Sequence, residues 1–212
     1  MRVGVINYGV GNLGSVLRSL EELGAESIRI DSAAEMGNTD CLILPGVGNF
    51  ADCAALLNQG GWVDALHREV IERRTPLLGI CVGMQLLATG SFEGSIDGKL
   101  VAGLGFIPGE VKHLRELGCN LRVPHVGWNS VTQHGDNCHL LASIPDGTDF
   151  YFVHSYAFIP YEASDLQAST DYGAPVSAIV RRGHIWGTQF HPEKSSRAGF
   201  QLLRNFIEGT EC

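Results

Sequence analysis

The stretch Leu77-Leu78-Gly79-Ile80-Cys81-Val82-Gly83-Met84 decides the fold, because a buried strand, a tight turn and the start of a helix follow one another within it. Glycines stand two residues before and two residues after Cys81, as in the turns that present a nucleophile at a sheet edge. The N-terminus of the following helix favours a thiolate and offers amides to an oxyanion. We therefore predict that Cys81 is a nucleophile. For Cys41, in another apolar run, we expect the ordinary fate of a buried packing residue.

The rest of the chain alternates strand and helix patterns. Strands are expected at 2–7, 27–30, 41–44 and 77–80, and helices at 12–23, at 50–74 with an interruption at 60–61, and from 84 to 88. This alternation predicts an α/β fold with a mostly parallel sheet covered by helices on both faces. From about Phe106, short β-like runs separated by turns, one of them at 135–137, predict extra, partly antiparallel strands in the same sheet. A last helix is expected at 198–207, and the whole chain, 1–212, is expected to form one domain.

Composition excludes several function classes. The 212 residues are 44% hydrophobic and 18% charged, with a net charge of -8, whereas a general nucleic-acid binder carries a basic surface. The apolar runs are much shorter than the ~20 residues of a spanning helix, and the N-terminus lacks the apolar segment of a signal peptide. We expect a cytoplasmic protein whose six cysteines, which form no CxxC pair, are reduced.

A cysteine nucleophile needs a base, and the base needs a group that orients it. The run Ile185-Trp186-Gly187-Thr188-Gln189-Phe190 leads into His191-Pro192-Glu193. Residues i and i+2 of an extended chain lie on one face, so Glu193 can reach the imidazole of His191. The sequence predicts a triad of Cys81, His191 and Glu193.

Two other interpretations start from local patterns. The segment 9–14 fits the dinucleotide fingerprint G-x-G-x-x-G, and Asp31 follows at a suitable distance. No hydride-transfer constellation follows, and a tight turn that needs glycine explains the pattern equally well. His134, Cys138 and His139 cluster, and His113, Cys119 and His125 lie upstream of them. These spacings match no standard zinc pattern. We expect neither a cofactor nor a metal.

Three further motifs carry a resemblance to a known family. They are Pro45-Gly46-Val47-Gly48, Pro124-His125-Val126-Gly127-Trp128-Asn129 and Tyr151-Phe152-Val153-His154-Ser155-Tyr156. With Cys81 and His191-Pro192-Glu193-Lys194-Ser195, they make the chain resemble class I (triad) glutamine amidotransferases, which have a flavodoxin-like fold. Within that class the set is similar to the glutaminase subunits of imidazole glycerol phosphate synthases, from Arg2 to the final helix.

The resemblance implies hydrolysis of glutamine to glutamate and ammonia. Cys81 would attack the carboxamide and form a thioester, and His191, held by Glu193, would move the protons. The positions implied to hold glutamine are Gly48, Gln85, Glu93, His154, Ser155 and Tyr156. The positions implied to hold the oxyanion are Val47, Gly48 and Val82.

The resemblance also implies a partner. Ammonia would pass to a (β/α)8-barrel cyclase subunit in a heterodimer that makes imidazole glycerol phosphate and aminoimidazole carboxamide ribotide for histidine biosynthesis. The implied interface positions are Asn12, Trp128, Tyr151 and Lys194.

Three alternatives remain open at this point. A glutaminase of another triad amidotransferase complex, for example one serving vitamin B6 or a sugar-modifying pathway, would keep the triad and differ in residues 124–129 and in the first loop. A cysteine peptidase on a related sheet would lack the contacts of Gln85 and Tyr156. A non-catalytic nucleotide-binding module would depend on the N-terminal glycines.

Overall fold

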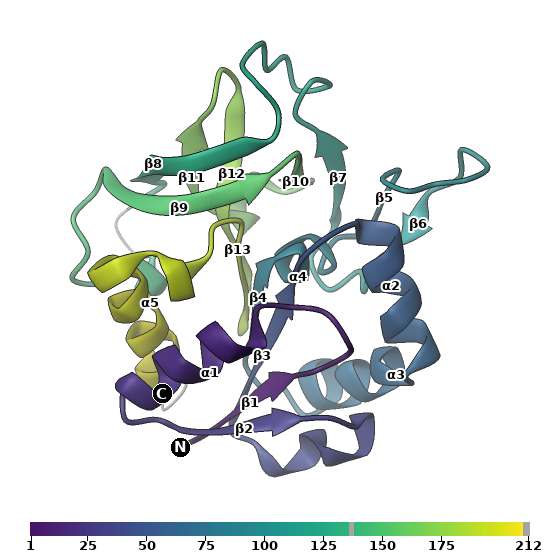
Figure 1. Cartoon of the computed structure of the whole chain (residues 1–212), viewed down its shortest axis with the longest axis vertical. Helices are drawn as coiled ribbons and strands as arrows, with labels where there is room; N and C mark the ends of the chain where they lie inside the picture. Colours follow the sequence, from purple (N-terminus) through teal and green to yellow (C-terminus); the bar gives the residue numbers. More distant parts are fainter. Residues whose placement is uncertain (136–137, 210–212) are drawn as a thin grey trace.

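A nine-stranded sheet runs through the computed structural model, which describes residues 1–135 and 138–209 (Figure 1). Its order is β2 (Glu26–Ile30), β1 (Arg2–Ile6), β3 (Cys41–Gly46), β4 (Leu77–Cys81), β13 (Ile185–Thr188), β12 (Pro175–Arg182), β11 (Leu166–Asp171), β8 (His125–Gln133) and β9 (Thr148–His154). The first five strands pair in parallel, and the pairs from β13 to β9 are antiparallel. The predicted α/β fold with added antiparallel strands is confirmed.

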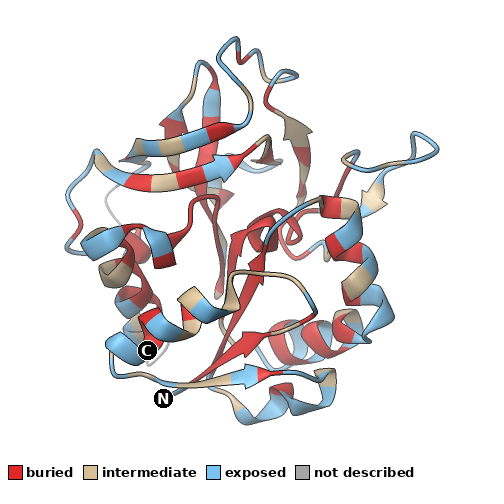
Figure 2. Cartoon of the chain, in the orientation of Figure 1, coloured by how far each residue is buried: buried red, intermediate tan, exposed pale blue. Residues whose placement is uncertain are grey.

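Helices cover both faces of the parallel part. On one face lie α1 (Leu13–Glu22) and α5 (Ser196–Glu208), and on the other lie α2 (Phe50–Gln59), α3 (Trp62–Leu66) and the π-helical turn η2 (His67–Glu72) (Figure 1). The strands between them are buried, whereas the helices are buried only on their inner sides (Figure 2). The predicted break at 60–61 separates α2 from α3. Short 3-10 turns are η1 (Ala33–Asn38), η3 (His139–Leu141), η4 (Ala163–Asp165) and η5 (Pro192–Lys194).

Some of the extra strands form a second sheet, which corrects the expectation of a single one. Its order is β10 (Tyr156–Pro160), β7 (Gly109–His113), β5 (Gly90–Ser91) and β6 (Val101–Ala102). Ser155 alone separates β9 from β10, so the chain changes sheets across one residue. The turn predicted at 135–137 lies partly outside the described residues, which end at 135 and resume at 138.

The helix expected at 84–88 is also corrected. The helix α4 spans only Val82–Gln85, because the carbonyls of Leu86, Leu87 and Ala88 accept hydrogen bonds from the passing segment 104–107 instead of continuing the helix. The expected strand 41–44 extends to Gly46, which pairs with Cys81. Among the described residues, no helix is both long and apolar enough to cross a membrane.

The turn around Cys81 is packed tightly against β3. A Cβ atom on Gly79 would lie 2.6 Å from the Gly83 carbonyl oxygen, and a Cβ on Gly46 would lie 2.5 Å from the Gly83 nitrogen. A Cβ on Gly83 would collide with the Leu44 carbonyl. Backbone atoms cannot move aside as a flexible side chain does. Each of these three positions therefore has no room for a side chain.

We expect Gly83→Ala to lower the free energy of unfolding by about 1–3 kcal/mol, because it overpacks the turn against backbone. Gly14→Ala is the control, since nothing lies within 4 Å of its Cβ position in α1, and it should stabilise the protein by about 0.5–1 kcal/mol. Urea unfolding measures both changes. Equal effects would contradict the close packing at Gly83.

Candidate active site

Cys81 is the last residue of β4 and precedes α4, at the carboxyl edge of the parallel strands. Ligands of open α/β sheets bind at this edge. The Cys81 backbone has φ 57° and ψ -112°. Residues other than glycine adopt this conformation rarely, at a cost of about 1–3 kcal/mol. The tight turn predicted from the flanking glycines is present, and the Cys81 backbone in it is strained.

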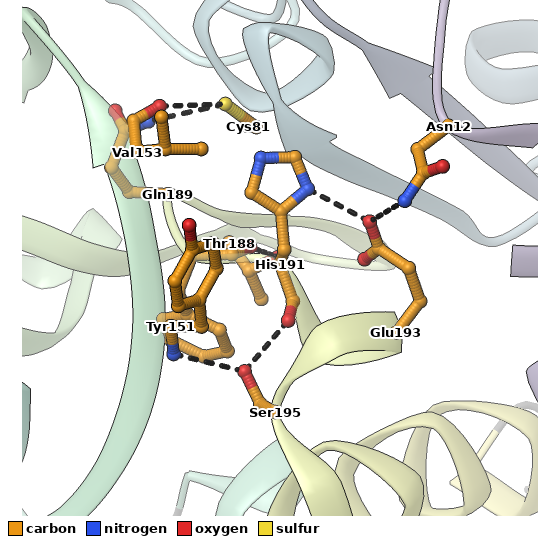
Figure 3. A network of polar contacts seen from close by, with 10 residues as sticks. Asn12, Cys81, Tyr151, Val153, Thr188, Gln189, His191, Glu193 and Ser195 are labelled. Atoms are coloured by element: carbon orange, nitrogen blue, oxygen red, sulfur yellow. Dashed lines mark hydrogen bonds and ion pairs between the residues drawn. The ribbon is translucent and has the colours of Figure 1, made fainter. Parts of the chain in front are cut away.

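His191 reaches the same edge because β13 lies beside β4 in parallel and ends three residues before it. The His191 Nδ1 lies 2.8 Å from Glu193 Oε1, and both side chains are buried. The other ring nitrogen, Nε2, points toward the Cys81 sulfur (Figure 3) and has no hydrogen-bond partner among the described residues. The three residues of the predicted triad thus lie in the predicted order.

Electrostatics favour a charged imidazole here. Burial opposes charge on His191, but the Cys81 sulfur and the Glu193 carboxylate outweigh burial and raise the pKa of His191 to about 9. Burial likewise disfavours the Glu193 carboxylate, yet the imidazole and the Asn12 amide lower the pKa of Glu193 below its ordinary value. At neutral pH the pair is an imidazolium and a carboxylate, so His191 can act as a proton donor.

Asn12 has a contact that the sequence did not reveal. Its amide nitrogen donates to Glu193 Oε1 at 3.1 Å across 181 residues of sequence. Asn12 precedes α1, and its side chain makes no capping hydrogen bond there. The residue predicted for a partner interface therefore also orients the carboxylate that orients His191.

Ser195 holds the His191 segment against β9. Its hydroxyl donates to the His191 carbonyl at 2.6 Å and accepts from the Tyr151 amide at 3.0 Å, while the His191 amide donates to the Tyr151 carbonyl at 2.9 Å (Figure 3). The position of His191 is thus tied to β9 by backbone contacts. The sequence placed Ser195 in a family motif but gave it no role.

A cavity of about 150 Å³ opens beside Cys81. The residues that line it are Val47, Gly48, Cys81, Val82, Gln85, Glu93, Val153, His154, Ser155, Tyr156 and His191. Every position expected to hold glutamine or the oxyanion is in this lining, and Val153 is an addition. Val153 lies inside the quoted motif 151–156, and its carbonyl oxygen lies 3.8 Å from the Cys81 sulfur.

Polar groups in the cavity wall are fixed by the protein. The Gln85 side-chain nitrogen donates to the Tyr156 carbonyl and to Gln189 Oε1, at 3.0 Å each. The Gln189 side-chain nitrogen lies 3.9 Å from the Cys81 sulfur, although sequence reasoning assigned Gln189 no part. Glu93 Oε2 accepts from the Phe50 amide at 3.0 Å, and burial raises the pKa of Glu93.

The segment considered for dinucleotide binding forms a glycine turn. Gly9 and Gly11 have φ of 105° and 129°, so the turn needs glycine at both positions. Asp31, the candidate ribose ligand, accepts from Asn7 at 2.6 Å and from Arg29 at 2.9 Å. Among residues 1–135 and 138–209, no three His, Cys, Asp or Glu side chains gather as a metal site would require.

The other implied interface residues meet on the outer face of the β8–β9 pair. Trp128 and Tyr151 are cross-strand partners with ring centroids 6.1 Å apart, and the Lys194 ammonium lies 6.0 Å from the Tyr151 ring. Trp128 is 54% exposed, and Val126 and Val153 beside it are 56% and 36% exposed. We call these five residues the outer patch. It adjoins the cavity at Val153.

Residues 4–209 match the sequence model of the family described as glutamine amidotransferase class-I. "Imidazole glycerol phosphate synthase subunit HisH" of Moorella thermoacetica is 48% identical over 206 residues, which cover 97% of this chain and 94% of that protein. The subunit HisH of Rhodospirillum rubrum is 44% identical over 214 residues, covering 98% of each chain.

Solved structures agree with the fold at much lower sequence identity. A crystal structure of a glutamine amidotransferase superposes with a TM-score of 0.74 at 21% identity and covers 99% of both chains. PurLQS from Thermotoga maritima superposes with a TM-score of 0.73 at 14% identity and covers 98% of both.

We expect Glu193→Gln to destabilise the fold more at pH 6 than at pH 9.5. The folded pKa of His191, about 9, lies above the ordinary ~6.5, so the imidazolium stabilises the fold below ~6.5 and this contribution disappears as the pH rises through 9. Removing the carboxylate charge should lower the free energy of unfolding by about 1–3 kcal/mol at pH 6.

Urea unfolding at both pH values, together with NMR titration of His191, measures this difference. Glu21→Gln is the control, because Glu21 is an exposed carboxylate on α1. An equal loss of stability at pH 6 and pH 9.5 would contradict a charged His191 stabilised by Glu193.

Proposed function

The chain belongs to the class-I glutamine amidotransferase family, and we propose that it is the glutaminase subunit of an imidazole glycerol phosphate synthase. The observation that carries this proposal is the convergence of Cys81, His191 and all the positions expected to hold glutamine on one cavity. Near full-length similarity to proteins named subunit HisH supports the choice of synthase.

The proposed reaction begins with attack of the Cys81 thiolate on the carboxamide carbon of glutamine. The C–N bond breaks as His191, charged at neutral pH because its pKa is about 9, gives its proton to the departing ammonia. A glutamyl thioester remains on Cys81. The now neutral His191 takes a proton from water, the resulting hydroxide attacks the thioester, and glutamate leaves while the thiolate is restored.

Substrate contacts follow from the cavity wall. The Glu93 carboxylate suits the α-ammonium of glutamine. The backbone amides of Val47, Gly48 and Val82 are the proposed oxyanion donors, and the loss of one such donor costs roughly 2.7–4 kcal/mol of barrier. Gly48 has φ 98°, so glycine suits this position. Tyr156 and Gln85 also line the cavity.

The outer patch is the proposed docking surface for a (β/α)8-barrel cyclase subunit. Aromatic residues and an exposed tryptophan are typical anchors of protein interfaces. The patch adjoins the cavity at Val153, so a partner seated there could receive ammonia without its release to solvent. The products of the complex would be imidazole glycerol phosphate and aminoimidazole carboxamide ribotide.

Cys81→Ala should reduce glutamate formation, measured with the barrel partner present, by roughly 10⁴-fold or more, because no nucleophile remains. Mass spectrometry of the wild-type protein during turnover should show a glutamyl adduct on Cys81. Cys41→Ala is the control, because Cys41 is fully buried in β3. The Cys41→Ala variant should still form glutamate. Full turnover by Cys81→Ala would refute the mechanism. Stimulation only by the barrel of another synthase would favour a paralogue.

Trp128→Ala should weaken binding of the barrel subunit by about 2 kcal/mol, or roughly 30-fold in Kd, because it removes an exposed aromatic anchor. Calorimetry measures the affinity, and alkylation of Cys81 in the free subunit should be unchanged. Tyr161→Ala is the matched control, since Tyr161 is 58% exposed and lies next to β10 of the second sheet. Unchanged affinity in Trp128→Ala would exclude the outer patch as the docking surface.

A further inference from the structure

Two buried histidines face each other on the inner side of the β8–β9 pair. His125 of β8 and His154 of β9 are direct cross-strand partners, and His125 Nδ1 lies 2.9 Å from His154 Nε2. They are 2% and 6% exposed. Burial lowers the pKa of His125 to about 4 and that of His154 to about 3, so both rings are neutral at neutral pH.

The hydrogen-bond partners fix one tautomer for each ring. His154 Nδ1 lies 2.8 Å from the Tyr156 carbonyl oxygen, which can only accept, so the proton of His154 is on Nδ1. The free lone pair on His154 Nε2 must then accept, and His125 Nδ1 must donate. His125 Nε2 is left as the acceptor for the Asn129 side-chain nitrogen at 3.4 Å.

Further polar contacts lead from His154 to Cys81. The Tyr156 carbonyl accepts from both His154 and Gln85, which uses both of its lone pairs. Gln85 donates its second proton to Gln189, whose side-chain nitrogen lies 3.9 Å from the Cys81 sulfur. Each donor meets an acceptor at every step from Asn129 to Cys81. No amide or imidazole in this series can flip without breaking a neighbouring hydrogen bond.

His154 therefore has no free ring nitrogen for glutamine, although it lines the cavity. Its imidazole instead fixes the turn at Ser155, where the chain passes from β9 to β10. The side chain that fixes His154 is His125, which belongs to the motif 124–129 and lies outside the cavity lining.

We propose that His125 is a positioning residue for glutamine binding, because its Nδ1–H fixes the orientation of the His154 ring, whose own Nδ1–H anchors the Tyr156 carbonyl and, through it, Gln85. This inference rests on the proposed glutaminase function. Without this donor, His154 Nε2 is a buried acceptor with no partner. The ring is then held at Nδ1 alone, so it can rotate about its Cβ–Cγ bond and weaken its hydrogen bond to the Tyr156 carbonyl. The cavity wall then loosens, while Cys81, His191 and Glu193 keep their own contacts.

Two variants separate this role from simple packing. His125 stacks on Tyr172 and Phe152, with ring centroids 3.8 and 4.9 Å away. His125→Phe keeps an aromatic ring in the stack and removes the donor. His125→Asn removes the ring but keeps a donor, since its amide nitrogen is two bonds beyond Cβ, as is Nδ1 in histidine. Thr132→Ala, at an exposed position of the same strand, is the control.

The first measurement is ¹⁵N NMR of the imidazole nitrogens in the full chain. It should show His154 protonated on Nδ1 in the wild type, in His125→Asn and in Thr132→Ala. In His125→Phe the proton should stay on Nδ1, while the ¹⁵N resonance of Nε2 should move to the higher shift of a ring nitrogen that accepts no hydrogen bond. Protonation of His154 on Nε2 in the wild type would overturn the proposal, whatever the activity of the protein.

The second measurement is inactivation by a chloroketone analogue of glutamine, compared with chloroacetamide, which alkylates thiols without resembling glutamine. His125→Phe should raise the half-saturating concentration of the analogue roughly tenfold, the usual effect of one unmade buried hydrogen bond, and leave the maximal rate and the chloroacetamide rate within about threefold. His125→Asn should stay near the wild type. Equal weakening in both variants, or none in either, would overturn the positioning role.

The same variants should show the same split in glutaminase assays of the complex with the barrel subunit, with KM raised in His125→Phe and kcat little changed. Glutamate formation that persists in Cys81→Ala would refute the proposed function and leave the NMR result standing. Wild-type kinetics in His125→Phe, with Cys81→Ala inactive, would refute the positioning role alone.

Discussion

The close approach of three backbone segments at Gly46, Gly79 and Gly83 is the constraint on which the rest of the site depends. Where a Cβ atom would collide with a neighbouring carbonyl or amide, β3, β4 and α4 can meet only through glycine. This contact forces the chain to turn within one residue, and Cys81 takes the strained conformation that the turn requires. The thiol is consequently held at the sheet edge by backbone packing, before any polar group contributes.

Polar groups then set the charge state of the site. Asn12, Glu193 and His191 form a series in which each member orients the next, and Ser195 fixes the His191 backbone against β9. The rings of His125 and His154, in the β8–β9 pair, have the opposite pKa shift to His191. Burial keeps His125 and His154 neutral, and no carboxylate of the described residues acts on their pKa values, whereas Glu193 acts on that of His191 and favours its charged form. The same residue type is thus charged beside Glu193 and neutral between β8 and β9.

The parts of this arrangement that are local in sequence could be predicted, and the parts that depend on distant pairing could not. The glycines around Cys81 and the two-residue offset of His191 and Glu193 are readable because turn and strand geometry are local. Contact between Asn12 and Glu193 spans 181 residues and follows from the packing of α1 beside η5, for which no pattern exists. The second sheet was missed because the change of sheet occurs at Ser155 alone. The shortened helix α4 was missed because its terminating hydrogen bonds come from residues 104–107.

The β8–β9 pair has one exposed face and one buried face. Val126 and Trp128 point outward, whereas His125 points inward, and alternation along the strand keeps the two sets apart. Substitutions on the outward positions can therefore accumulate without disturbing the inward ones. If the outer patch is the docking surface, as proposed, a change of partner would leave the residues that face the cavity untouched.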